Sequence, residues 1–194
     1  MIPRTERMTR TGIVSSDVYS DEFTHNRRIY LSGPIEDLGA TDICAQINHL
    51  AAQSNEDIYM IIHSPGGSVT AGLAILDTMR ACGCDICTIV SGLAASMGAV
   101  IASAGSKGKR YISRHAEMMI HQPLGGAQGQ ASDIERTAAH IVKMKKKLHS
   151  ILSENTGIPY DRICVDCDRD YYLDAHEAID YGLADHLFTG FDSL

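Results

Sequence analysis

A single serine stands in a setting that suits acyl-transfer chemistry. Ser96 lies in SGLAASMGA, residues 91–99, directly after the apolar run ICTIV and just before the apolar run AVIAS. Small residues let other backbones and ligands come close, and a serine between a strand and a helix has its oxygen beside the free N–H groups of that helix. An ordinary helix N-cap has the same residue type and position, so Ser96 alone leaves two interpretations open.

A nucleophilic serine needs a general base within hydrogen-bonding reach, and the base needs an acceptor that orients it. Among nine histidines, His121 follows the apolar run MMI and precedes Gln122-Pro123, and polar residues at strand ends build the sites of α/β proteins. A histidine bonded only to backbone is the alternative. Five others are expected on the surface or in helices: His49, His140, His149, His176 and His186. For the acid, spacing does not choose among three aspartates of DCDRDYY, which are Asp166, Asp168 and Asp170.

Two glycine-assisted turns offer donors for an oxyanion. Acyl transfer places negative charge on the carbonyl oxygen, and backbone N–H groups stabilise it in the transition state. SPGG, residues 64–67, lets Gly66 and Gly67 turn sharply before a helix, and the N–H of Met97 follows Ser96 at a second helix start. We expect two such helix starts on neighbouring strands to converge on one anion.

Alternating strand and helix patterns must bring these residues together. Apolar runs predict strands at 27–33, 57–63 and 85–90, with KRYIS and EMMIH as two shorter candidates. The run at 57–63 is nearly unbroken, which suits a strand covered on both faces. Helical patterns follow the main strands, the first of them capped by Thr41 or Asp42 and burying Ile43, Ile47 and Leu50. This alternation predicts one α/β domain with a parallel sheet and crossover helices.

A long amphipathic helix is predicted over residues 129–155, and it follows the glycine-rich stretch PLGGAQGQ, 123–130. Its apolar stripe consists of Ile134, Ala138, Ile141, Met144, Leu148 and Leu152. Such a helix is roughly 40 Å long, which exceeds what so small a domain can cover. We expect the stripe to contact another copy of the chain, and a helix lying across its own sheet is the alternative. A second helix is predicted from Asp174 to Tyr181, ending at Gly182.

Composition narrows the partners and the compartment. The chain has 194 residues, of which 44% are hydrophobic, and a net charge of −7. The negative net charge argues against nucleic acid as a partner. No apolar run reaches membrane-spanning length. The charged N-terminal sequence MIPRTERMTR is not a secretory signal. Six cysteines in CGCDIC, CVDC and at position 44 are interpreted as free thiols of a cytoplasmic protein, with a zinc site as the alternative. No metal is expected.

Four motifs in order resemble the proteolytic subunits of the Clp protease family. They are SPGGSVTAG, GLAASMGA, MMIHQPLGGAQGQASDIE and DRDYYLDAHEAIDYGLAD, and the similarity runs from about Tyr19 to Phe188. The resemblance implies a ClpP/crotonase-like single domain over 21–194. It also implies a protruding handle at about 122–156, made of a glycine-rich strand and the long helix, and an N-terminal axial arm at 1–20. GG before a helix alone would also suit relatives of enoyl-CoA hydratase, a crotonase-type interpretation that does not account for the Ser–His–Asp set.

The resemblance assigns roles to residues that match the family motifs. The family's nucleophile, base and orienting acid match Ser96, His121 and Asp170, which implies a serine endopeptidase. The oxyanion hole matches the N–H groups of Gly67 and Met97. The substrate backbone is expected along Gly66, Gly125, Gly126 and Gln130, by β-addition. The contact between rings matches Asp168 and Arg169.

The family also implies an assembly and partners. Two stacked rings of seven copies enclose the sites, and a hexameric AAA+ unfoldase of the ClpX, ClpA or ClpC type uses ATP to feed in unfolded proteins. The chain has no P-loop, so ATP is that partner's cofactor and the chain needs none. A ring subunit that does not cut, within a mixed assembly with a second ClpP-like chain, is the alternative. The intact Ser96, His121 and Asp170 argue against it.

Some positions depart from the family pattern. The residues after Ile2-Pro3 are RTERMTR, where an aliphatic start is usual, and His63 replaces the usual asparagine before SPGG. The cleft that receives the unfoldase matches Tyr59, Ile61, Ile89, Ser91, Tyr111, Ser113 and Phe188. Aromatic or aliphatic side chains are commoner at three of these positions, Ile61, Ser91 and Ser113. Two hydroxyls in an apolar cleft cost about 1 kcal/mol or more each when unsatisfied, so we predict weaker docking of the unfoldase or a different partner.

Overall fold

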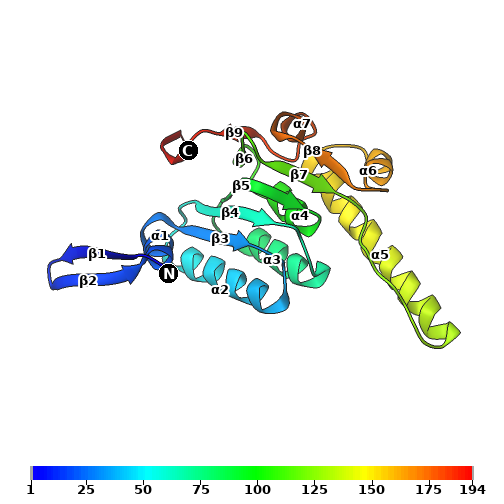
Figure 1. The fold of residues 1–194 in the computed structure, drawn as a ribbon, viewed down its shortest axis with the longest axis horizontal. Coiled ribbons are helices and arrows are strands. Elements are labelled where there is room, and N and C mark those ends of the chain that lie inside the picture. Colours follow the sequence, from blue (N-terminus) through cyan, green and yellow to red (C-terminus); the bar gives the residue numbers. More distant parts are fainter. Residues whose placement is uncertain (1, 194) are drawn as a thin grey trace.

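The computed structural model describes residues 2–193 and has a mostly parallel, seven-stranded sheet at its centre (Figure 1). Five parallel strands follow one another in the sheet: β3 (Arg28–Ser32), β4 (Ile58–Ser64), β5 (Ile86–Ala95), β6 (Arg110–Ser113) and β9 (His186–Phe188). β7 (Glu117–Ile120) pairs in parallel with the end of β5, and β8 (Tyr171–Leu173) pairs antiparallel with β7. The predicted strands and the α/β class are confirmed. β8 and β9 have three residues each, too few for a periodic pattern.

Three helices bury the apolar side of the sheet: α2 (Asp37–Gln53), α3 (Val69–Ala81) and α4 (Met97–Ser103). Along β4, Ile58, Met60 and Ile62 are completely buried in this core. The alternate residues Tyr59 and Ile61 are only partly buried and His63 is exposed. The expectation of a strand covered on both faces is therefore wrong within one chain. α2 begins at Asp37, before the expected caps Thr41 and Asp42. Its first turn holds the exposed Leu38 and Ala40, which is buried but too small to give a clear apolar signal.

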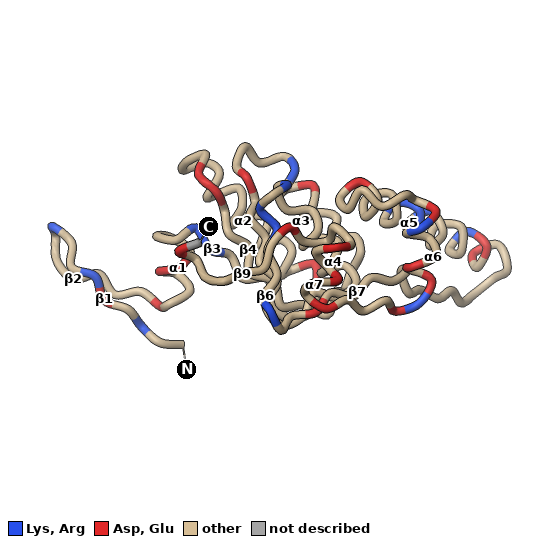
Figure 2. The backbone as a smooth tube through the Cα atoms, turned by 90° about the horizontal axis from the view of Figure 1, so that it is seen from above, with Lys and Arg blue, Asp and Glu red and all other residues tan. Residues whose placement is uncertain are grey.

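The N-terminal arm is a β-hairpin, which the charged sequence did not indicate. β1 (Arg4–Thr9) and β2 (Gly12–Asp17) pair antiparallel across a two-residue turn, and such turns favour the strand twist of a hairpin. α1 (Val18–Asn26) follows, with Asp17 accepting a hydrogen bond from the Ser20 N–H as its N-cap. The hairpin and α5 lie at opposite ends of the folded molecule, and the hairpin carries charges of its own (Figure 2).

The long helix α5 (Ala131–Thr156) leaves the body of the protein instead of lying across the sheet (Figure 1). Its C-terminal part is anchored in the core by Leu148, Ile151 and Leu152. Farther out, Ile134 is 40% and Val142 51% exposed, so one chain leaves the outer part of the apolar face uncovered. The alternative of a helix packed on its own sheet is wrong.

The expected glycine-rich strand is not a strand in the single chain. Residues 121–128 form no regular structure and run beside α5 (Figure 1). A helix cannot supply ladder hydrogen bonds because its backbone groups are used internally. At Gly125, an added Cβ would lie 2.7 Å from Cδ1 of Ile141, so the absence of a side chain lets this segment approach the helix closely.

After α5 the described chain continues through α6 (Tyr160–Asp166), β8, α7 (Ala175–Asp180), β9 and a short 3₁₀ helix, Phe191–Ser193. α7 begins at a capping box of Asp174 and Glu177, close to the predicted start. Within residues 2–193 no helix is long and apolar enough to cross a membrane. The same residues bring no three His, Cys, Asp or Glu side chains together as a metal site.

A buried ion pair between Arg110 of β6 and Asp185 connects the sheet to helices α4 and α5. The Arg110 side chain is 5% exposed and that of Asp185 15%. Arg110 Nε donates to Asp185 Oδ2 at 2.9 Å, and Arg110 Nη1 donates to the carbonyls of Ser103 in α4 and Asn155 in α5. Burial by itself raises the pKa of the Asp185 carboxyl, but hydrogen bonds from Arg110 and Gly108 outweigh it and hold that pKa below its ordinary value.

Asp185→Ala is expected to lower the free energy of unfolding by about 3–5 kcal/mol, because it leaves the Arg110 charge buried without its partner. Since the pKa of Asp185 is lowered in the folded state, its contribution is complete above its unfolded pKa and is lost as the pH falls through the folded one. Chemical denaturation near neutral and at acidic pH measures both effects. Equal stability of wild type and variant near neutral pH would contradict the assignment.

Candidate active site

Ser96 occupies a strained junction between β5 and α4. Its backbone has φ 55° and ψ −121°, a region that side chains adopt only when the surroundings impose it. The Ser96 N–H donates to the Met119 carbonyl of β7 at 2.8 Å, which fixes the turn. The residue holds the N-cap position of α4, but its hydroxyl makes no capping hydrogen bond. The N-cap interpretation is therefore wrong for the Ser96 side chain, because its hydroxyl does not cap α4 and can hydrogen-bond elsewhere.

The register of three neighbouring strands brings the predicted triad together. Ala95 at the end of β5 pairs with Met119 of β7, so Ser96 and His121 follow at adjacent strand ends. Ile120 of β7 pairs with Tyr171 of β8, which runs in the opposite direction. His121 is the residue after Ile120, and Asp170 is the residue before Tyr171. The antiparallel strand β8 thus delivers its carboxylate to the same edge as the serine and the imidazole.

The side chains form a hydrogen-bonded relay. His121 Nε2 lies 2.8 Å from Ser96 Oγ, and His121 Nδ1 lies 2.9 Å from Asp170 Oδ1. The His121 side chain is 12% exposed, whereas Asp170 is 58% exposed. An ionised Asp170 accepts from Nδ1–H, which leaves the Nε2 lone pair to accept from the serine hydroxyl.

The other two aspartates of DCDRDYY have different partners. Asp166 Oδ2 accepts from Arg162 Nε at 2.7 Å and from the Tyr181 hydroxyl at 2.8 Å. Asp168 is exposed, and its carbonyl accepts from the Gln122 side chain at 2.8 Å. Of the three aspartates that sequence spacing left open, Asp170 is therefore the one whose carboxylate bonds the imidazole of His121.

The SPGG turn lies directly against the serine. Gly66 has φ +91°, and a Cβ there would lie 2.7 Å from Ser96 Cβ and 2.9 Å from the Met97 nitrogen. Ile35 N–H donates to the Gly66 carbonyl, and Ser68 N–H donates to the Ile35 carbonyl, so the turn is tied down on its far side. Within the described chain, neither the N–H of Gly67 nor that of Met97 has a hydrogen-bond acceptor. Two backbone donors next to Ser96 are thus available to an oxyanion.

A small apolar pocket opens beside Ser96 and His121. Besides these two residues it is lined by Val69, Met97, Val100, Ile120, Pro123, Leu148 and Leu152. Helices α3, α4 and α5 and the end of β7 all contribute to it. Its volume is only about 20 Å³, room for about one water molecule, so within one chain it forms a mostly apolar wall beside the relay.

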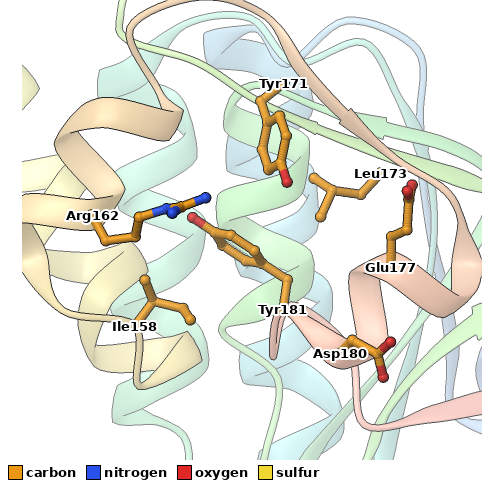
Figure 3. Close-up of a pocket in the computed structure, with 7 residues that line it drawn as sticks. All are labelled: Ile158, Arg162, Tyr171, Leu173, Glu177, Asp180 and Tyr181. Atoms are coloured by element: carbon orange, nitrogen blue, oxygen red, sulfur yellow. The ribbon is translucent and has the colours of Figure 1, made fainter.

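A larger surface pocket, of about 420 Å³, lies between α6, β8 and α7 (Figure 3). Its lining is Ile158, Arg162, Tyr171, Leu173, Glu177, Asp180 and Tyr181. Tyr171 follows Asp170 in the chain, but no triad residue lines this pocket. Arg162 and the Tyr181 hydroxyl already bind Asp166, and the residues that line the pocket include no serine or cysteine paired with a histidine, so it is not the candidate active site.

The residues expected to hold the substrate and the second ring lie on the handle side. Gly125 and Gly126 are exposed beside α5, and Gln130 is the N-cap residue of that helix. Asp168 and Arg169 are exposed between α6 and β8.

The seven residues expected to receive the unfoldase share one face of the sheet, the side away from α2 and α3. Ile61, Ile89 and Tyr111 are paired across β4, β5 and β6, and Ser113 is paired with Phe188 of β9. Tyr59 and Ser91 lie two residues away on the same face. Ile89 is only 1% exposed, so its side chain lies buried beneath the other residues of this surface. The other six have exposed or partly exposed side chains.

Two histidines have surroundings that sequence reasoning missed. His149 is helical as expected but only 1% exposed, and its Nδ1 lies 3.2 Å from Cys164 Sγ. Its burial lowers the pKa of the imidazole. The sequence signal for this burial is the position of His149 directly after Leu148, at the end of the apolar stripe that is anchored in the core. His63 binds the backbone of β5, and no sequence pattern identifies such a contact.

A serine, a histidine and an aspartate in relay, with free backbone N–H groups beside the serine, define a serine hydrolase on an α/β sheet. Residues 10–190 match the family model for Clp protease. Two curated relatives from Streptococcus thermophilus, strains LMD-9 and CNRZ 1066, are each 47% identical over 192 residues, 97% of both chains. One from Streptococcus salivarius is equally similar, and all three are named "ATP-dependent Clp protease proteolytic subunit". The chain belongs to the Clp protease family, which confirms the resemblance and the ClpP-like fold.

Proposed function

We propose that this chain is the proteolytic subunit of an ATP-dependent Clp protease and that Ser96, His121 and Asp170 cut the peptide bond. The relay of 2.8 Å and 2.9 Å contacts across the ends of β5, β7 and β8 carries this proposal. Family membership supports the same reaction, serine endopeptidase cleavage, from independent observations.

The mechanism uses groups that the chain already holds in place. His121 Nε2 takes the proton of Ser96 as Oγ attacks the carbonyl carbon of the substrate. The N–H groups of Gly67 and Met97 stabilise the oxyanion, and Asp170 stabilises the imidazolium. The imidazolium then gives its proton to the leaving amine, which leaves an ester on Ser96. Water attacks that ester with His121 again as the base, and the serine is restored.

Unfolded polypeptide is the proposed substrate, bound as an added strand. The backbone of residues 121–128 pairs with no strand of the described chain, so its N–H and C=O groups can bind an extended peptide. Gly125 and Gly126 lie on this segment, Gln130 follows it at the N-cap of α5, and Gly66 lies against the serine. The peptide would thus be held between the handle and the SPGG turn.

The proposed assembly is two stacked heptameric rings. The exposed apolar residues Ile134 and Val142 on α5 support a contact between copies there, with Asp168 and Arg169 nearby in the ring–ring contact. The hairpin at the opposite end would then face the axial entrance (Figure 2). An AAA+ unfoldase of the ClpX, ClpA or ClpC type supplies ATP-driven unfolding, and the chain itself needs no cofactor. We place the complex in the cytoplasm, alone or with a second ClpP-like chain.

Docking of the unfoldase is expected to strengthen when the cleft becomes more apolar. Ser113→Leu adds an aliphatic side chain where Ser113 and Phe188 lie side by side. Burying it would lower the half-saturating unfoldase concentration by about tenfold, from roughly 1.5 kcal/mol of added apolar burial. Unfoldase-stimulated peptide hydrolysis measures this concentration. No shift, with ordinary docking by the wild type, would contradict both the cleft assignment and the predicted weak docking.

A fluorophosphonate probe tests the proposed function directly. It reacts with an activated serine, so the wild-type chain should be labelled at Ser96, as located by peptide mass spectrometry. His121→Ala should slow labelling strongly because the base is lost. A wild-type chain that assembles but is not labelled would overturn the proposal and favour a ring subunit that does not cut.

A further inference from the structure

The pairing of β4 with β5, the strand that leads to Ser96, contains a bulge. β4 and β5 pair regularly up to Ile62 and Val90, and pairing resumes at Ser64 and Ala94. One residue of β4, His63, therefore lies opposite three residues of β5, which are Ser91, Gly92 and Leu93. Bulges interrupt the hydrogen-bond ladder and redirect a strand, and they are common beside active sites. This one lies three residues before Ser96.

The imidazole of His63 fills the gap that the bulge leaves. The Leu93 N–H donates to His63 Nδ1 at 3.2 Å. Gly92 has φ +90°, and a Cβ there would lie 2.7 Å from His63 Nδ1. The backbone of Gly92 and the ring of His63 are thus fitted to each other.

His63 also connects the bulge to the strand beside it. Its carbonyl accepts from the Gly33 N–H at 2.9 Å. The next residue, Ser64, donates through Oγ to the Gly33 carbonyl at 2.7 Å and accepts there from the Gly66 N–H at 3.1 Å. The end of β4 is therefore fixed on one side to β3 and to the SPGG turn, and through the imidazole to β5.

We propose that His63 is a positioning residue for peptide hydrolysis, which rests on the function proposed above. By accepting from Leu93 N–H, His63 Nδ1 sets the register of residues 93–95 against residues 117–119 of β7. That register places Ser96 within reach of His121. The imidazole touches neither the substrate nor the reacting atoms and acts only through β5.

The required chemistry is one acceptor atom at the Nδ1 position. Asparagine carries Oδ1 at a similar distance from the backbone and can accept from the same N–H. Phenylalanine keeps a ring of similar size but has no acceptor, and alanine removes both. The series His63→Asn, His63→Phe and His63→Ala therefore separates hydrogen bonding from packing. His176→Asn, at an exposed position on α7, is the matched control.

The variants are tested by kcat and KM for a short fluorogenic peptide. Losing one hydrogen bond that positions Ser96 should lower kcat about threefold to tenfold in His63→Phe and His63→Ala, with KM little changed. His63→Asn should remain within about twofold of the wild type, as should the control. Amide hydrogen exchange at Leu93 should be faster in the Phe and Ala variants only.

Either of two results would overturn the inference. In one, His63→Phe keeps full kcat, so the acceptor is not needed. In the other, His63→Asn falls as far as His63→Ala, so the residue is only structural. Failure of the proposed function has a different signature, which is the absence of probe labelling at Ser96 in the wild-type chain.

Discussion

Ser96→Ala is expected to lower kcat for peptide hydrolysis by roughly 10⁴- to 10⁶-fold, the range found when the nucleophile of a triad is removed. His121 would keep its hydrogen bond to Asp170, but no oxygen could form the acyl ester. Turnover of a fluorogenic peptide measures the loss, and the mass of the native protein shows whether the proposed rings still form. We expect the assembly to be unchanged, because within residues 2–193 the hydroxyl has no partner outside the relay.

The stability of this variant distinguishes a nucleophile from an N-cap. Removing a capping hydroxyl typically costs about 1 kcal/mol, whereas the Ser96 hydroxyl makes no capping hydrogen bond. The free energy of unfolding should therefore stay close to that of the wild type. Ser150→Ala, at an exposed position on α5, is the control and should keep full turnover. Hydrolysis by Ser96→Ala at the wild-type rate would contradict the assignment.

The parallel part of the fold was predictable because burial on the helix-covered side makes its strands apolar. Ile58, Met60 and Ile62 are completely buried, and this side alone gives the run at 57–63 its character. The opposite side of β4 is more open than the run suggested, with His63 exposed. Apolar content thus located the strand but overstated its coverage.

The candidate site was predictable in its residue types but not in its assembly. Ser96 and His121 stand at ends of strands that the pattern located. Asp170 precedes β8, which has three residues and pairs antiparallel with β7. So short a strand has no detectable period, and its register depends on long-range pairing. The choice of Asp170 over Asp166 and Asp168 therefore needed family resemblance before the structure and geometry after it.

Two errors have a common physical origin in backbone hydrogen bonding. A hairpin was missed at 4–17 because its strands are held by each other and need no apolar face. A strand was expected at the glycine-rich segment, where one chain offers no ladder partner. Strand formation depends on what lies alongside, which local sequence does not specify.

Asp170→Asn is expected to lower kcat by roughly 10²- to 10⁴-fold, a smaller loss than that of Ser96→Ala. The asparagine amide can donate to His121 Nδ1, which favours the tautomer with its proton on Nε2. That proton would then face Ser96 Oγ, and the imidazole could not act as the base. The lower end of the range reflects the 58% exposure of Asp170, since water or the amide oxygen can partly replace the carboxylate.

The measurement compares three aspartates in the same part of the chain. Asp161→Asn, exposed on α6, should keep its turnover. Asp166→Asn should lose thermal stability before turnover, because Asp166 binds Arg162 and Tyr181 and its side chain is 7% exposed. Only Asp170→Asn should lower kcat while leaving KM and stability nearly unchanged, because among the described residues its carboxylate bonds only the imidazole it orients. A drop shared equally by all three variants would mean that they act by loosening the fold and that the relay has no special acid.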